Sequence, residues 1–376
     1  MAMAMEEVPP MDVRKGVCFA LFAYEVGLAI RLDEAERRIT AMTQRLRLGR
    51  TRRGPRYFEY RPAPLRVTFE ADPLAIGEFH SGASVDVVLY DFGAVSVTYH
   101  LPLEGPFSRL LDLSEVLYDN VLLLADSRSR VEHLLATIGE AVERPSISDS
   151  VEDYVIFQVE ECTPALAGDE LCAAHARAIA QILRCERLPL SEQEVQDALS
   201  CRISFGMDDA TVIDWNAGLL YGHDTDDERA VLEFANVELL EMRHLDQQLS
   251  DALDQAYEAL TRRMEGRFRW PVLSDADKPR IAQLQVDSAI LFERVTNALK
   301  LVGDQYLARV YRLASQRFHL ERWDAGILRK LETLNSIYGK MSDQAATRRM
   351  EVLEWIIIIL ITVSIGVMFL PGTAGH

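Results

Sequence analysis

Six arginines between residues 45 and 56 are the side chains with the clearest binding character in this chain. They are Arg45, Arg47, Arg50, Arg52, Arg53 and Arg56, and the aromatic residues Tyr57, Phe58 and Tyr60 follow them. Guanidinium groups beside aromatic rings can bind phosphates and stack on RNA bases, or they can contact anionic lipid headgroups. The same arginines can also form a solvated surface loop or neutralise acidic side chains elsewhere in the chain. The sequence leaves these alternatives open.

The tripeptide Asp91-Phe92-Gly93 matches the magnesium-binding motif of protein kinases. The HRD catalytic loop and the glycine-rich phosphate loop of kinases are missing from the sequence. The tripeptide lies between two strand-like segments, where Asp-x-Gly is ordinary turn chemistry. We therefore predict a β-turn at this position.

A second cluster of acidic side chains follows His223 and comprises Asp224, Asp226, Asp227 and Glu228. Carboxylate oxygens of this kind can hold a divalent cation. Acidic residues are also favoured in the first turn of a helix, because they face the positive end of the helix dipole. A long helical pattern begins here, so the sequence favours a helix start over a metal site.

Other common catalytic motifs are also absent from the sequence. The sequence contains no GxSxG, GxGxxG, GxxxxGK[ST] or HExxH motif, and its five cysteines include no CxxC pair. We therefore assign no catalytic, cofactor-binding or metal-binding residue, and the sequence leans against an enzyme.

The net charge of −18 is unevenly distributed along the chain. Residues 1–66 carry 13 basic and 8 acidic side chains, whereas residues 67–222 carry 8 basic and 27 acidic side chains. The acidic middle segment would repel nucleic acid and anionic lipid, but the N-terminal segment would not.

Residues 12–222 are predicted to form an α+β domain with a mixed sheet. Strands are expected at 16–22, 65–70, 85–90, 94–100 and 153–160, with a further hairpin at 210–221. Helices are expected at 33–48, twice between 105 and 142, near 168–186 and at 191–200. The strands and helices do not alternate strictly, which favours α+β over a parallel βαβ fold.

Residues 228–350 show helical periodicity and no strand signal. Three apolar stripes run from Leu232 to Met264, from Ile281 to Ala314 and from Trp323 to Met341. Helices of this length with short breaks predict an antiparallel bundle or coiled-coil-like stalk. The stripes can pack within one chain, against a partner chain, or both.

Residues 352–370 are predicted to form a single C-terminal transmembrane helix. No charged residue occurs from Trp355 to Leu370, and roughly 17 to 25 helical residues cross a bilayer core. Leu353, Glu354 and Trp355 form the entry to this span, with Trp355 suited to the membrane interface. Basic residues lie before the span and none lies after it. The positive-inside rule then places the N-terminal bulk in the cytoplasm, so we expect a single-pass protein of the cytoplasmic (inner) membrane.

Four segments together resemble a known family. They are VLYDFGAVSVTYHLPLEG at 88–105, two helices that carry His175, Ala178, Ala180, Gln181, Leu190, Ser191 and Glu194, LETLNSIYGKMSD at 331–343, and LEWIIIILITVSI at 353–365. These segments are similar to the YagE / required-for-meiotic-nuclear-division (RMD) family, a domain of unknown function in membrane-anchored proteins. The resemblance implies homo-oligomers, and in mitochondrial relatives a role in holding ribosomes near the inner membrane. It implies no catalytic residue.

Three functional hypotheses follow. The leading one is a non-enzymatic, membrane-anchored scaffold or assembly factor that self-associates through its C-terminal helices. The alternatives are a ribosome- or RNA-tethering factor that supports translation at the membrane, and a membrane-bound enzyme or ligand sensor with a site in the α+β domain. The expected partners are a membrane, a second copy of the chain, and a ribosome or RNA. No cofactor and no small-molecule substrate are implied.

Overall fold

The computed structural model of the chain describes residues 10–46, 51–53, 63–265, 286, 305–337, 339 and 358. The chain divides into two compact units. The first holds Met1–Leu245 and Val286–Asp324, and the second holds Asp246–Gln285 and Ala325–His376.

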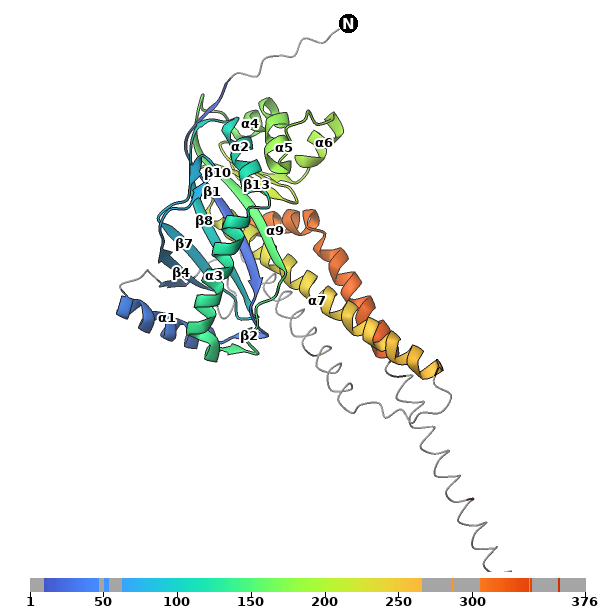
Figure 1. The fold of residues 1–376 in the computed structure, drawn as a ribbon. Coiled ribbons are helices and arrows are strands. Elements are labelled where there is room, and N and C mark those ends of the chain that lie inside the picture. Colours follow the sequence, from blue (N-terminus) through green and yellow to red (C-terminus); the bar gives the residue numbers. More distant parts are fainter. Residues whose placement is uncertain are drawn as a thin grey trace, which may run out of the picture. The chain divides into compact units, whose positions relative to one another are not determined.

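The first unit is built on one large sheet, which has nine strands among the described residues (Figure 1). In spatial order these are β11 (Arg202–Ile203), β12 (Ala210–Ile213), β13 (Ala217–Tyr221), β10 (Val151–Thr163), β1 (Asp12–Glu25), β8 (Ala94–Pro106), β7 (Ser84–Leu89), β4 (Leu65–Glu70) and β3 (Thr51–Arg53). Neighbouring strands pair antiparallel, except β10 and β13, which are parallel. Two short pairs lie beside this sheet, β2 (Ala29–Ile30) with β9 (Val142–Glu143) and β5 (Ala75–Ile76) with β6 (Phe79–His80).

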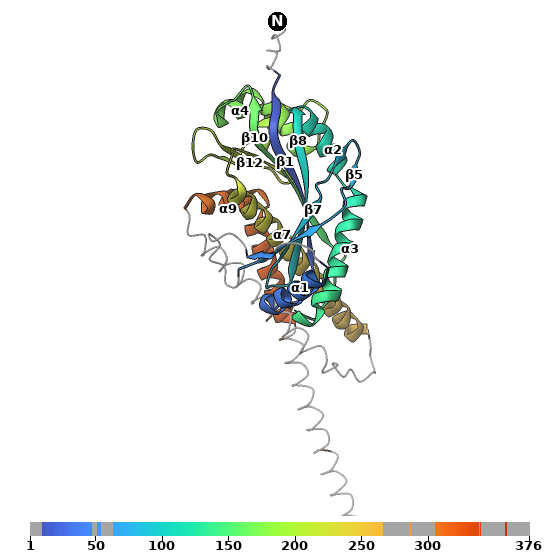
Figure 2. The ribbon, with the colours of Figure 1, turned by 90° about the vertical axis from the view of Figure 1, so that its left-hand side faces the viewer.

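Helices cover both faces of the sheet (Figures 1 and 2). One face carries α1 (Leu32–Leu46), α2 (Arg109–Leu117), α3 (Val121–Ile138), a 3-10 turn (Gly139–Ala141), α4 (Gly168–Ala174) and α5 (Ala176–Arg184), with α6 (Glu192–Ala198) packed on α5. The other face carries α9 (Gln305–Arg317) and the first part of α7 (Asp226–Glu265). Burial on both faces explains why strand β1 is apolar at nearly every position from Val17 to Tyr24.

The turn between β7 and β8 is the place where Asp91-Phe92-Gly93 lies, and the prediction of a β-turn is confirmed. Gly93 has a φ of 106°, a left-handed conformation that favours glycine. A Cβ atom at Gly93 would lie 1.7 Å from the carbonyl oxygen of Gly27. The tripeptide therefore acts as a tight turn packed against a neighbouring loop.

The described part of the second unit is helical. Helix α7 continues from Asp246 to Glu265, and residues 325–337 form a second helical segment that runs beside it in the same direction (Figure 1). Leu249, Ile327 and Leu334 are buried here, and Lys330 Nζ lies 2.7 Å from Ser250 Oγ. Most of the second stripe predicted at 281–314 lies outside the described residues.

The prediction of a fold that ends in a transmembrane helix is not supported and is corrected here. Among the residues that the structure describes, no helix is long and apolar enough to cross a bilayer. The span proposed at 352–370, apart from Ile358, lies outside the described residues, as do Leu353, Glu354 and Trp355. The supported architecture is a mixed α/β protein with a large multi-stranded sheet and flanking helices.

Candidate functional site at the β11–β13 edge

The arginines singled out from the sequence are not gathered into a described site. Arg45 lies in the last turn of α1, and Arg52 and Arg53 lie in edge strand β3, opposite Arg66 and Leu65 of β4. Arg47, Arg50 and Arg56 lie outside the described residues. Contact of these arginines with RNA or lipid stays a prediction.

Arg66, on strand β4, forms ion pairs within the protein. Its Nη2 donates to Glu233 Oε2 of α7 at 2.7 Å, and its Nη1 donates to Asp86 Oδ2 of β7 at 3.1 Å. Ser96 Oγ donates to the other oxygen of Glu233 at 2.9 Å. Arg66 therefore links β4 to α7 through a buried carboxylate.

The pKa values of Asp86 and Arg66 are shifted in the directions expected for an ion-pair network. Burial raises the pKa of Asp86, but hydrogen bonds from His100 and Thr68 and the charge of Arg66 outweigh burial and hold that pKa well below its usual range. The charge of Glu233 is the largest influence on the pKa of Arg66 and raises it further. Both groups are charged at neutral pH, so the network stabilises the packing and does not transfer protons.

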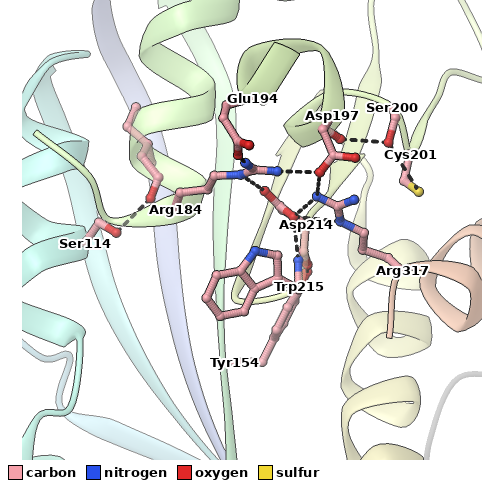
Figure 3. Close-up of polar contacts among 11 residues, drawn as sticks. Ser114, Tyr154, Arg184, Glu194, Asp197, Ser200, Cys201, Asp214, Trp215 and Arg317 are labelled. Carbon is pink, nitrogen blue, oxygen red and sulfur yellow. Dashed lines mark hydrogen bonds and ion pairs between the residues drawn. The ribbon is translucent and has the colours of Figure 1, made fainter. Parts of the chain in front are cut away.

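A second network surrounds Asp214, at the turn between β12 and β13 (Figure 3). The Asp214 side chain has no solvent exposure, and its carboxylate accepts from Arg184 Nε at 3.0 Å and from Arg317 Nε at 2.7 Å. Arg184 is the last residue of α5 and Arg317 is the last residue of α9. Cations are favoured at helix C-termini because of the helix dipole. Two helix ends thus converge on one buried aspartate.

Helix α6 closes this network from outside. Ser191 caps the helix, because its Oγ accepts from the main-chain N–H of Glu194 at 3.2 Å. Asp197 follows Glu194 by about one helical turn. Glu194 and Asp197 therefore lie on the same face of α6, towards the two arginines. Asp197 Oδ2 lies 2.6 Å from Arg184 Nη2 and 2.9 Å from Arg317 Nη2, and Glu194 contacts Arg184.

Each arginine of this network faces more than one carboxylate. Burial lowers the pKa of Arg317, but its hydrogen bonds and charge pairing with Asp197 and Asp214 outweigh burial and hold that pKa above the ordinary value. The same balance, with burial again the largest single influence, raises the pKa of Arg184. The two arginines therefore stay charged at neutral pH, and their contacts with Asp214 can fix the β12–β13 turn in one conformation.

The turn that is fixed in this way exposes a tryptophan. Asp214 Oδ1 also accepts from the main-chain N–H of Trp215 at 2.8 Å, while 54% of the surface of Trp215 remains exposed. The chain reverses here through an Asp214 N–H to Ala217 carbonyl bond of 2.9 Å. The backbone at this large aromatic residue is therefore held by the Asp214 carboxylate (Figure 3), while about half of the residue stays exposed.

The loop between β11 and β12 is also held by an aspartate and also exposes large apolar side chains. The Asp209 carboxylate accepts from the main-chain N–H of Phe205 at 2.8 Å and from that of Gly206. The Met207 carbonyl accepts from the main-chain N–H of Gly168 at 2.9 Å. Phe205 and Met207 are nevertheless 79% and 82% exposed. The two connections at opposite ends of β12 thus each present large apolar side chains on a backbone held by an aspartate.

Sequence reasoning recognised the hairpin at 210–221 but missed this surface. The signal that was available is the residue type: Trp215 occupies a turn position where small polar residues are usual, and Phe205 and Met207 lie in a loop. Single exposed apolar residues are common on protein surfaces, whereas several of them gathered together mark a contact surface. The described residues contain no group of three or more His, Cys, Asp or Glu side chains arranged to hold a metal ion.

Comparison with known proteins adds one family. Residues 15–228 match the family model described as "Uncharacterized protein MJ0711, N-terminal domain". A protein named "Uncharacterized protein MJ0711" from Methanocaldococcus jannaschii is 23% identical over 276 residues, which cover 73% of this chain and 74% of that protein. No solved structure matches the chain. These matches overturn the resemblance to the YagE / RMD family, whose segments at 88–105 and 171–200 form an ordinary hairpin and short helices here.

Proposed function

We propose, on the premise that the chain belongs to the family of the MJ0711 N-terminal domain, that it is a non-enzymatic assembly module. Its docking surface is the edge formed by β11, β12 and β13, with Trp215, Phe205 and Met207 as the contact residues. This proposal keeps the scaffold hypothesis and moves the contact from the C-terminal helices to the sheet edge.

The observation that carries the proposal is the rigid presentation of these three side chains. Trp215 and Phe205 are each held by an aspartate that accepts a main-chain N–H. A preorganised aromatic side chain loses little conformational entropy on binding, and tryptophan is enriched among residues that dominate binding energy. The buried ion-pair cluster behind Trp215 supports this role, because it prevents the turn from adjusting.

The partner that we propose is a second copy of the chain. Most soluble oligomers are homo-oligomers, and a two-fold interface brings the same patch of both subunits together. Strand β11, Arg202–Ile203, is the last strand on this side of the described sheet, so the exposed side chains of the two adjoining connections can meet the same side chains of another copy.

The test is sedimentation of the full-length chain over a concentration series, with a matched control variant. We expect a dimer at micromolar concentration, and we expect Trp215→Ala to weaken dimerisation at least about tenfold, as for a residue that dominates binding energy. Tyr118→Ala is the control, because Tyr118 is an aromatic residue with nearly the same exposure, 53%, on the connection between α2 and α3. It should leave dimerisation unchanged.

Two outcomes would contradict the proposal. A chain that remains monomeric at about 100 micromolar has no such interface, since specific dimers bind well below that concentration. If the Trp215→Ala and Tyr118→Ala variants dimerise like the wild type while Leu328→Glu does not, the contact lies on the C-terminal helices instead. Leu328 is a half-exposed leucine of the second unit and is therefore the matched probe of that alternative.

A further inference from the structure

Helix α7 places an unusual number of acidic side chains in the interior of the first unit. Glu233, Glu238 and Glu241 are all 3% exposed or less. Glu233 is compensated by Arg66. Buried carboxylates are costly unless a cation or a proton neutralises them, so Glu238 and Glu241 need another explanation.

Glu241 meets a second buried carboxyl group. Its carboxyl group faces that of Glu25, the last residue of β1. Among the described residues, Glu25 Oε2 and Glu241 Oε1 have no hydrogen-bond partner. Two carboxyl groups that touch in a buried position cannot both be ionised, because the like charges repel and water cannot screen them. A shared proton is therefore required to hold β1 and α7 together here.

Glu238 lies one turn earlier on the same helix, and its burial favours the neutral carboxyl group, although a hydrogen bond from Tyr311 favours the charged one. The Tyr311 hydroxyl of α9 donates to Glu238 Oε2. Asp324, which follows α9, adds a further negative charge near this pair. Ionisation of Glu238 would thus place two negative charges, on Glu238 and Asp324, close together between α7 and the segment after α9.

The other charged groups around this stretch do not neutralise it. On β10, Glu152 Oε2 accepts from Arg243 Nη1 at 2.7 Å, and the Arg243 guanidinium lies over the ring of Trp323 at 5.9 Å. Arg243 is thereby engaged with Glu152. Burial lowers the pKa of His244, which follows it on α7, so this imidazole favours its neutral form.

We propose that residues 238–245 of α7 are a proton-dependent latch, which docks on the sheet while Glu238 and the Glu25–Glu241 pair are protonated and is released when those protons are lost. Helix α7 carries the chain from the first unit into the second at Leu245. The latch therefore acts on the last stretch of the helix before that boundary, and it goes beyond the proposed assembly function because it needs no partner.

The direction of the pH dependence follows from the carboxyl groups. Burial, followed by the charge of Glu241, raises the pKa of Glu25 well above its ordinary value, and burial raises the pKa of Glu241 to about 7 and that of Glu238 to about 8. Groups with a raised pKa bind more protons in the folded state than in the unfolded state. Their contribution to stability is complete below the ordinary glutamate pKa of about 4.5 and is lost as the pH rises through about 7 to 8.

Hydrogen–deuterium exchange of the full-length chain tests the latch. After correction for intrinsic exchange, protection of residues 238–245 should fall at least about tenfold between about pH 6 and about pH 8.5, while residues 121–138 of α3 keep their protection. Glu241→Gln mimics the protonated side chain, so it should reduce this pH dependence, while Glu238 still contributes its part. Glu132→Gln, on the exposed side of α3, should retain it.

Two results of the exchange experiment would contradict the latch. If wild-type protection of residues 238–245 does not change with pH, or if the Glu241→Gln variant keeps the full pH dependence, the latch does not exist. Should the glutamine variant fail to fold, denaturation of the wild type decides the matter. If the denaturation midpoint of the wild type is higher at about pH 8.5 than at about pH 6, the proposal is overturned. If the midpoint is lower at about pH 8.5, the proposal is supported.

Discussion

Replacing Asp214 with Asn is expected to lower the free energy of unfolding by about 3 to 5 kcal/mol, the usual loss when one member of a buried ion pair is removed. The substitution preserves the shape of the side chain and removes its charge. Arg184 and Arg317, whose side chains are only 11% and 12% exposed, would then lose their buried counter-charge. Urea denaturation of the full-length variant measures the loss.

Asp197→Asn is the matched control for this prediction. Asp197 contacts the same two arginines, but its side chain is 55% exposed. Exposed ion pairs contribute about 0 to 1 kcal/mol, so this variant should be nearly as stable as the wild type. Equal losses for the two variants would mean that burial of Asp214 is not what makes the cluster stabilising.

Replacing Arg66 with Met is the second substitution with a large expected effect. Glu233 would remain 2% exposed without its cation, at a cost of about 3 to 5 kcal/mol in unfolding free energy. Asp86 would lose one partner but keep Thr68, whose Oγ1 donates to it at 2.6 Å. Most of the loss should therefore come from Glu233 and is measured by the same denaturation experiment.

The double variant Arg66→Met with Glu233→Gln separates the ion pair from simple packing. A neutral glutamine at position 233 can still accept the hydrogen bond from Ser96. Replacing both partners of a buried pair is often nearly neutral, whereas breaking the pair is not. We expect the double variant to recover most of the stability lost by Arg66→Met alone. A double variant no more stable than the single one would show that uncompensated charge is not the cause.

The local elements of the first unit were largely accessible to sequence reasoning. The strand predicted at 65–70 coincides with β4, and the hairpins predicted at 85–100 and 210–221 correspond to β7–β8 and β12–β13. The acidic turn at 226–228 does start helix α7. These elements depend on patterns among neighbouring residues, which a single sequence displays directly.

The sequence predicts strand β1 shorter than it is, because its length depends on pairing with distant strands. The strand predicted at 16–22 is the middle of β1, which extends from Asp12 to Glu25. The polar ends of β1 carry no strong strand signal, and they become strand because β8 and β10 pair with them along nearly their whole length. The family assignment failed for a related reason, since short hairpin and helix motifs recur in unrelated folds.

The sequence by itself determined where most strands, turns and helix starts of the first unit lie, because backbone preferences act over a few residues. Only the tertiary structure decided which charges meet. Arg66 and Glu233 are 167 positions apart, and Arg317 and Asp214 are 103 positions apart. Whether an arginine binds a carboxylate of its own chain or an external anion depends on burial. The order of the strands and the helices packed on them create that burial, and residue type alone does not encode it.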